Sequence, residues 1–200
     1  MSKIFFTGDK HHQHDKILDY DNRPFKSIDE HDSKLIFNHN SMVKKDDICY
    51  DLGDFYFRGG KEASGRKVYS HYLNQYNGRY VIIRGNHERN NKVVDKIFSA
   101  NLNMFGIRIF LVHDPLNSKV EADLNIVAHV HNWFKEMELQ ENGKKSLIIN
   151  VGVTQWKYRP VTAEQIYTIY CRWKKGLIKP EVFDKQALVK FRTERKNRKE

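Results

Sequence analysis

The 200-residue chain lacks any run of about 18 consecutive apolar residues, so the sequence predicts no membrane-spanning helix. Cysteine is also scarce, and Cys49 and Cys171 lie far apart and fit no zinc-binding spacing. So few cysteines in a chain of this size favour a reducing compartment. The apolar stretch Ile4–Phe6 near the N-terminus is too short for the core of a secretory signal. We therefore expect a cytoplasmic protein without a membrane anchor.

The excess of positive over negative charge is small in most of the chain, although the net charge of the whole chain is +10. Residues 171–200 hold 11 Lys and Arg against 4 Asp and Glu, a net charge of +7, which leaves +3 for the other 170 residues. The main body therefore gives no sign of a basic nucleic-acid groove. We expect one domain over 1–170 and a basic extension over 171–200 that is helical or disordered. The extension either holds nucleic acid electrostatically or keeps the protein soluble.

Six short runs are nearly continuous in apolar character, which is typical of strands that are buried on both faces. They are Ile4–Thr7, Asp47–Leu52, Tyr80–Arg84, Ile107–Val112, Asn125–Ala128 and Leu147–Val151. Apolar residues at helical spacing predict helices over 30–44, 64–76 and 90–100. Asn142-Gly143 is typical of a hairpin turn between two strands. Strands that alternate with helices in this way predict a layered α/β protein.

Polar side chains follow five of these runs, at the point where each predicted strand ends. They are Asp9, His11, Asp54, Asn86, His87, His113, His129 and His131. In open α/β sheets the ligand site lies beyond the carboxyl ends of the strands, so these side chains are expected to converge. Asp9 and His11 are two residues apart, as are His129 and His131. In extended chain that spacing points both side chains of a pair to one side.

The donors in this set are carboxylates, imidazoles and one amide, without a thiolate. Such a set suits Mn, Mg, Fe or Zn in a catalytic site better than a structural zinc site. Two carboxylates and four imidazoles are too many for one four-coordinate ion, so a pair of ions that share a carboxylate is expected. A single histidine beside an apolar run is usually structural. His31, His39 and His71 lie on predicted helices and fit that interpretation.

The order of these motifs resembles that of the calcineurin-like metallophosphoesterases, over about residues 4–160. The family pattern reads D-x-H, G-D, G-N-H-[DE], a single H and G-H-x-H. Here it stands as Asp9-Lys10-His11, Gly53-Asp54, Gly85-Asn86-His87-Glu88, His113 and Ala128-His129-Val130-His131. Finer features, such as Leu111 to Pro115 and Ile149 to Val153, resemble a small prokaryotic and phage phosphoesterase (phosphohydrolase) branch. The resemblance implies a layered αββα sandwich of two mixed sheets flanked by helices.

The resemblance also implies a role for each motif residue. One metal ion would be held by Asp9, His11, Asp54 and His131, and the other by Asp54, Asn86, His113 and His129. Asp54 would bridge the ions, and a hydroxide between them would attack phosphorus in line. His87 would protonate the leaving oxygen, and the other interpretation is a structural histidine. We expect two divalent ions, with Mn²⁺ the first choice and Fe, Zn, Ni or Mg the alternatives.

Several further residues are candidates for contact with the substrate. The cationic candidates for a phosphate clamp are Arg58, Arg84 and Lys135, and each competes with the interpretation of a solvated surface charge. His14 is a candidate for positioning substrate or water. Tyr56, Trp133 and Trp156 are candidates for stacking on a base, although large aromatic side chains near strand ends more often belong to the core.

Four functions remain open at this point. The leading one is a phosphodiesterase or phosphatase that acts on nucleotide-like or small phosphate esters. A Ser/Thr-type protein phosphatase is supported by Arg58-Gly59 and by Arg84 to Glu88, but Phe57 and His12 depart from the pattern of those enzymes. A nuclease is supported by the basic extension. The fourth is a catalytically silent scaffold that binds partners, which the complete ligand set disfavours.

Overall fold

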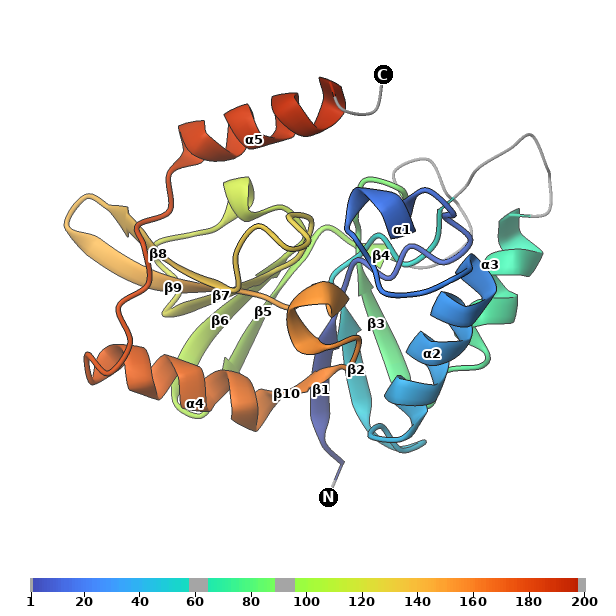
Figure 1. Ribbon diagram of the computed structural model, residues 1–200. Coiled ribbons are helices and arrows are strands. Elements are labelled where there is room, and N and C mark those ends of the chain that lie inside the picture. Colours follow the sequence, from blue (N-terminus) through green and yellow to red (C-terminus); the bar gives the residue numbers. More distant parts are fainter. Residues whose placement is uncertain (1, 58–64, 89–95, 198–200) are drawn as a thin grey trace.

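The computed structural model describes residues 2–57, 65–88 and 96–197 of the chain. Two five-stranded sheets lie face to face, with helices on their outer sides and at one end of the sandwich (Figure 1). Both sheets contain parallel and antiparallel pairs. The α/β class and the αββα arrangement of two mixed sheets are therefore confirmed.

The first sheet combines four parallel strands with one short antiparallel edge strand. Its order is β10 (Val161–Thr162), β1 (Ile4–Thr7), β2 (Ile48–Asp51), β3 (Arg79–Ile83) and β4 (Lys96–Ile97). The helices α2 (Ile28–Asn40) and α3 (Gly65–Leu73) cover its outer face, where Ile36 and Leu73 pack around Phe55 and Ile82. The short helix α1 (Ile17–Tyr20) lies in the long connection between β1 and α2.

The second sheet has parallel strands in its centre and antiparallel strands at both edges. Its order is β5 (Ser99–Met104), β6 (Ile107–Val112), β7 (Leu124–Val127), β9 (Lys144–Asn150) and β8 (Glu136–Glu141). The 3₁₀ turns η1 (Pro115–Asn117) and η2 (Val153–Trp156) follow β6 and β9. Asn142 and Gly143 both have positive φ, as a tight hairpin turn requires, and they join β8 to β9.

The main core fills the space between the two sheets. Phe6, Leu52 and Ile83 from the first sheet join Leu111 and Ile126 from the second, each no more than 3% exposed. Burial of large apolar side chains stabilises the fold by about 1.5–3 kcal/mol for each residue. Because these residues lie directly before the polar strand ends, the same core fixes where those ends lie.

Helix α4 (Ala163–Lys174) closes one end of the sandwich. Thr162 and Gln165 form a capping box at its start, and Ile166 and Tyr170 pack into the main core. Residue 171, where the basic extension begins in the sequence, lies inside this helix. The division of the chain at 170/171 stays a prediction.

The chain after α4 packs against the outer side of the second sheet. Val182 pairs with Glu138 at the edge of β8, and Phe183 and Leu188 are buried beside Ile148. Leu188 belongs to α5 (Lys185–Asn197), which lies on the far side of this sheet from the main core (Figure 1). Part of the basic extension is thus helical, one of the two expected forms.

The sequence identified six strands and two helices within a few residues. The predicted helix over 90–100 is wrong in its described part, because Lys96–Ile97 and Ser99–Met104 are strands, and residues 89–95 lie outside the described residues. The strands β4, β5 and β10 were missed because they are short or polar edge strands. Across residues 2–57, 65–88 and 96–197, the helices are all too short or too polar to cross a bilayer.

Candidate metal centre

The polar residues that follow β1, β2, β3, β6 and β7 come together at one edge of the sandwich. Three groups of His and Asp side chains have ligand atoms within 4.8 Å of one another. The groups are Asp9, His11 and His131, then His11, Asp54 and His87, then Asp54, His113 and His129. The convergence expected from the strand ends is therefore present, and the role of each residue as a metal ligand stays a prediction.

The backbone at these residues is not extended, so the argument from i and i+2 spacing in extended chain is wrong. Asp9, His11, Asp54, His129 and His131 all have positive φ, between 49° and 73°. Residues other than glycine seldom adopt this left-handed conformation, and such strain gathers at functional sites. Asp9 and His11 share a group, whereas the paired histidines His129 and His131 reach into two neighbouring groups.

The carboxylate of Asp54 belongs to two of these three groups. Its Oδ2 is 3.8 Å from Nε2 of His11 and 3.4 Å from Nε2 of His113. Nε2 of His113 is in turn 3.1 Å from Nδ1 of His129. Two ligands of one ion, each about 2.1 Å from it, lie about 3.0–3.4 Å apart. The distances from His113 to Asp54 and to His129 therefore fit donors around one cation, whereas the distance from Asp54 to His11 is longer than this range.

His11 gives the clearest sign that an ion belongs here. Its side chain is only 2% exposed, and neither ring nitrogen makes a hydrogen bond within the part of the chain that the structure describes. Burial lowers the pKa of His11 well below its usual value, against the opposing effect of Asp54. A neutral, buried imidazole without hydrogen bonds leaves polar atoms unsatisfied, and coordination to a metal removes that cost. The residues present thus fit a metal ion.

His113 is oriented by a hydrogen bond that leaves one nitrogen for the site. Its Nδ1 donates to the carbonyl oxygen of Leu52 at 2.5 Å, so Nε2 faces Asp54. Burial alone lowers the pKa of His113, but Asp54, with a smaller effect from Asp9, raises it to about 10. The carboxylates therefore draw a positive charge into this space, and a metal ion would displace that proton.

Asp9 is held from the opposite side by the second sheet. The backbone N–H of His129 donates to its two oxygens, at 2.8 and 3.0 Å. Burial raises the pKa of Asp9 despite the nearby histidines. A Cβ at Gly152 would lie only 2.7 Å from Oδ2 of Asp9, so this position needs glycine. The two sheets thus meet at a carboxylate that both of them position.

His131 is oriented by residues that the sequence did not single out. Its Nδ1 donates to the carboxylate of Asp21, and Arg23 holds the same carboxylate from 3.0 Å. The Arg23 guanidinium also donates to the carbonyl oxygens of Asp9 and Lys10, at 2.9 and 3.0 Å. A carboxylate behind a histidine fixes the tautomer and direction of a metal ligand. No periodic pattern of residues marks this pair, which lies in the turn between α1 and α2.

Glu88, the last residue of the G-N-H-E motif, joins two loops of the site. Its buried carboxylate accepts hydrogen bonds from the backbone N–H groups of Asp54, Phe55 and Gly85, at 2.8 to 2.9 Å. Burial and the charge of Asp54 raise the pKa of Glu88 to about 7. A Cβ at Gly85 would lie 2.3 Å from Oδ1 of Asp54, so this contact also needs glycine.

The other predicted site residues lie around this centre. The His87 side chain is 31% exposed, and its Nε2 is 3.9 Å from Oδ2 of Asp54. The Asn86 amide faces Nδ1 of His129 at 2.9 Å. The ring of His14 stacks on Phe57 with centroids 3.8 Å apart. His87, like His129, is thus only partly buried, and it lies beside the shared carboxylate.

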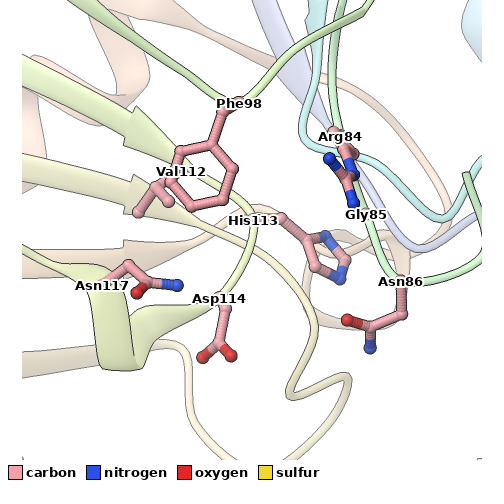
Figure 2. Close-up of a pocket in the computed structure, with 8 residues that line it drawn as sticks. All are labelled: Arg84, Gly85, Asn86, Phe98, Val112, His113, Asp114 and Asn117. Atoms are coloured by element: carbon pink, nitrogen blue, oxygen red, sulfur yellow. The ribbon is translucent and has the colours of Figure 1, made fainter. Parts of the chain in front are cut away.

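The candidate phosphate clamps have separate surroundings. Arg84 is half-buried and lines a cavity of about 280 Å³ next to Asn86 and His113 (Figure 2). The Lys135 ammonium lies over the ring of Trp156, 4.2 Å from its centroid. Arg58 lies outside the described residues. Of the two that the structure describes, Arg84 is the one that lies beside the metal centre.

The aromatic candidates for base stacking have neighbours in the protein. Trp133 packs against Phe134 and Phe183 in the cluster on the outer side of the second sheet. Trp156 donates to the carbonyl oxygen of Asn150 at 2.8 Å. The ring of Tyr56 lies near Tyr69 and Tyr72 over the first sheet. Packing accounts for these three rings.

Comparison with known proteins gives matches over most of the chain. A family model described as calcineurin-like phosphoesterase matches residues 2–189. An uncharacterized protein of Methanocaldococcus jannaschii is 34% identical over 169 residues, which cover 83% of this chain and 90% of that protein. Among solved structures, a protein of unknown function from Aquifex aeolicus has a TM-score of 0.63 at 22% identity, over 84% of this chain and 100% of that chain. An archaeal phosphodiesterase has a TM-score of 0.42 at 17% identity, over 75% and 83%.

Proposed function

The chain belongs to the calcineurin-like phosphoesterase family, and on that premise we propose that it hydrolyses nucleotide-like or small phosphate esters, as a phosphodiesterase or phosphatase with two divalent metal ions. The observation that carries this proposal is the position of the Asp54 carboxylate. One of its oxygens lies 3.8 Å from His11, 3.4 Å from His113 and 3.9 Å from His87. A single carboxylate is thus shared by two groups of donors and lies beside the partly exposed imidazole of His87.

We assign the two ions to two sets of donors that share Asp54. Asp9, His11, Asp54 and His131 would hold one ion, and Asp54, Asn86, His113 and His129 the other. When bound, two such ions supply an activated water and neutralise charge on the phosphoryl group. The donors are oxygen and nitrogen atoms, so we propose Mn²⁺ first, with Fe, Zn, Ni and Mg as alternatives. The unsatisfied nitrogens of buried His11 support this assignment.

His87 and Arg84 would act directly on the substrate. His87 is partly exposed beside Asp54, where an imidazole can give a proton to the oxygen of the leaving alcohol. Arg84 would bind the phosphate group, because the paired N–H donors of a guanidinium match two phosphate oxygens. Lys135 and Arg58 stay candidates for the same task, and His14 stays a candidate for positioning substrate.

We also propose that the protein works in the cytoplasm. Both cysteines are free: Cys49 is buried in the first sheet, and Cys171 lies on α4. Unpaired cysteines are typical of reducing compartments. The basic extension would add electrostatic affinity for nucleic acid, which salt would weaken.

The proposal is tested by hydrolysis of bis-p-nitrophenyl phosphate and p-nitrophenyl phosphate. Metal-stripped protein would be assayed after addition of Mn²⁺, Mg²⁺, Zn²⁺ or Ni²⁺, and bound ions would be counted by elemental analysis. We expect turnover that depends on metal, about two ions per chain, and loss of turnover in Asp54→Asn and His87→Ala. His71→Ala serves as the control, because His71 is exposed on α3.

The outcomes separate the alternative functions. Preference for the diester supports a phosphodiesterase, whereas preference for the monoester, followed by turnover of a phosphopeptide, supports a protein phosphatase. Cleavage of single-stranded DNA that is lost when Lys and Arg residues of 171–200 are replaced by Gln supports a nuclease. A folded protein that binds two ions and cleaves none of these esters would contradict the proposal and favour a scaffold.

A further inference from the structure

A cavity of about 280 Å³ opens directly beside the metal centre. Its walls come from the end of β3, the junction of β4 and β5, and the turn after β6. The polar and aromatic residues that line it are Arg84, Asn86, Phe98, His113, Asp114 and Asn117 (Figure 2). Asn86 and His113 belong to the metal centre described above. A ligand in this cavity would therefore lie next to the phosphate group that reacts at the metal centre.

The two sides of the cavity differ in chemistry. Figure 2 shows Arg84, Asn86 and His113 on one side, and Phe98 and Asn117 on the other, with Asp114 between them. The first side offers a cation and two groups of the metal centre, which suit a phosphate. The second side offers an aromatic face, an amide and a carboxylate, which suit a flat ring that carries hydrogen-bonding groups.

Within the residues that the structure describes, packing does not explain the position of Phe98 in this wall. Its side chain is 61% exposed, although its neighbours in β5 and β6 contribute to the core. A phenylalanine exposed to this degree beside a polar cavity offers a face on which a base can stack. Stacking on such a face tolerates any base, because every base has a π-face.

Asp114 and Asn117 give the cavity its polar character. Oδ1 of Asp114 accepts the backbone N–H of Leu116 at 2.9 Å, which fixes the direction of the carboxylate at the start of η1. Asn117, the last residue of η1, offers both a donor and an acceptor. The two carboxylate oxygens carry several lone pairs, so Asp114 can accept a further hydrogen bond from a ring or exocyclic N–H group. The far side therefore suits a heterocycle with hydrogen-bonding groups at its edge.

We propose that this cavity binds the nucleoside part of the substrate, with its base against Phe98 and its edge at Asp114 and Asn117. This inference rests on the proposed function and narrows it to esters of a single nucleotide. The volume supports the limit, because about 280 Å³ lies at the lower end of the range for small-ligand pockets. Arg84 then holds the phosphate that joins this nucleoside to the metal centre.

The test compares two probes that differ only in the base. Adenosine 5′-monophosphate and ribose 5-phosphate would be titrated calorimetrically into metal-loaded protein, and hydrolysis of their methyl esters would be followed by ³¹P NMR. We expect the adenosine probe to bind at least about 10-fold more tightly than the ribose probe, as stacking of one base typically gives. Phe98→Ala should reduce this ratio about 10-fold, and Phe98→Trp should restore it.

Two further variants separate recognition from general damage. Asn117→Ala should also reduce the ratio of the two dissociation constants, through loss of contact with the edge of the base. Phe37→Ala is the matched control, because Phe37 is 65% exposed on α2, on the outer side of the first sheet. It should leave the ratio unchanged. Thermal unfolding of each variant checks that the fold is intact.

The outcomes distinguish this inference from the function on which it rests. Equal affinity of the wild-type protein for the two probes overturns the inference. An equal loss of affinity for both probes in Phe98→Ala overturns it as well. If such a protein still hydrolyses bis-p-nitrophenyl phosphate with added metal, the proposed function survives. If the protein hydrolyses no ester but discriminates the two probes through Phe98, the nucleoside site stands and the hydrolytic function falls.

Discussion

The carboxylate of Asp21 accepts the Nδ1–H of His131, a residue 110 positions further along the chain. Arg23 donates to the same carboxylate, and its side chain is wholly buried. The Arg23 guanidinium also lies 2.8 Å from Nε2 of His31, whose Nδ1 is 2.8 Å from Asp32 on α2. A network of buried polar groups thus connects helix α2 to the metal centre. Because the groups of this network are hydrogen-bonded to one another, the orientation of the His131 ring depends on residues as distant from the metal centre as those of helix α2.

We expect Asp21→Asn to weaken metal binding roughly 10- to 100-fold, the usual effect of losing a carboxylate behind a metal-bound histidine. The amide has the shape of the carboxylate but lacks the charge that strengthens the hydrogen bond from the Nδ1–H of His131. Calorimetric titration of the metal-stripped protein with Mn²⁺ and Zn²⁺ measures the change. Asp19→Asn, at an exposed position in α1, is the control. Equal affinities in wild type and Asp21→Asn would contradict a role for Asp21 in orienting the ligand.

Glu88→Gln should destabilise the metal-free protein by about 1–3 kcal/mol. Glu88 accepts three backbone N–H groups, and an amide at this position has only one oxygen and turns its NH₂ toward a donor. Denaturant-induced unfolding of the metal-stripped protein gives the free energy. The exposed Glu181, replaced by Gln, shows the effect of the same change where no such bonds depend on it. A loss no larger than that of the control would argue against Glu88 as the joint between the two loops.

The sequence predicted the strands that position the site because those strands are buried on both faces. Ile4–Thr7 and Ile107–Val112 have the predicted bounds. A short, continuous apolar run in a layered protein is most easily buried as a strand inside a sheet. Strand β5 has the sequence SANLNM, which is half polar because it is an edge strand with exposed Asn101 and Asn103. An edge strand depends on backbone pairing with its neighbour more than on burial of its side chains. The hydrophobic pattern alone therefore does not reveal it.

The candidate ligands were predictable from their places after the strands, but the groups that hold them were not. Lys10, Asp21, Arg23, Asp51 and Glu88 are buried charges. Composition suggests a solvated position for such residues, and burial is tolerated only where a partner is present. Apart from Asp21 and Arg23, which contact each other, most of those partners lie between 13 and 110 residues away, so little in the local sequence indicates them. The positive φ of five candidate ligands is likewise a product of tertiary structure, because aspartate and histidine adopt it only under constraint.

A buried ion pair between Lys10 and Asp51 offers a separate test of how the first two motif loops are held together. Lys10 is 2% exposed and Asp51 is fully buried, and the ammonium lies 5.3 Å from the ring centroids of Phe55 and Tyr76. Lys10→Met should destabilise the protein by about 3–5 kcal/mol, because it leaves the buried carboxylate of Asp51 without its ion-pair partner. Lys10→Met with Asp51→Asn should cost less than the sum of the single changes. Additive free energies of unfolding would show that the pair is not coupled.

The stability of the protein should fall as the pH decreases from about 6.5, and His39 should account for part of that fall. His39 is buried, and its Nε2 donates to the carbonyl oxygen of Asn77 at 2.9 Å. Burial, with a smaller effect from Lys10, lowers the pKa of His39 from 6.5 to about 3. Between these values the unfolded chain binds a proton that the folded protein does not, so acid favours unfolding. The stability is complete above the unfolded pKa and is lost as the pH falls toward the folded pKa.

His39→Gln removes this proton and keeps a donor for Asn77. The free energy of unfolding of the variant should therefore depend less on pH, by about 1.4 kcal/mol per pH unit between pH 6 and 4, the value for one proton. Urea unfolding at several pH values measures both slopes in metal-stripped protein. His71→Gln, on the exposed side of α3, should keep the wild-type slope. Burial lowers the pKa of His12 and His31 in the same direction, so a residual slope is expected in the variant. Identical slopes in wild type and His39→Gln would mean that His39 takes up its proton equally in the folded and unfolded states.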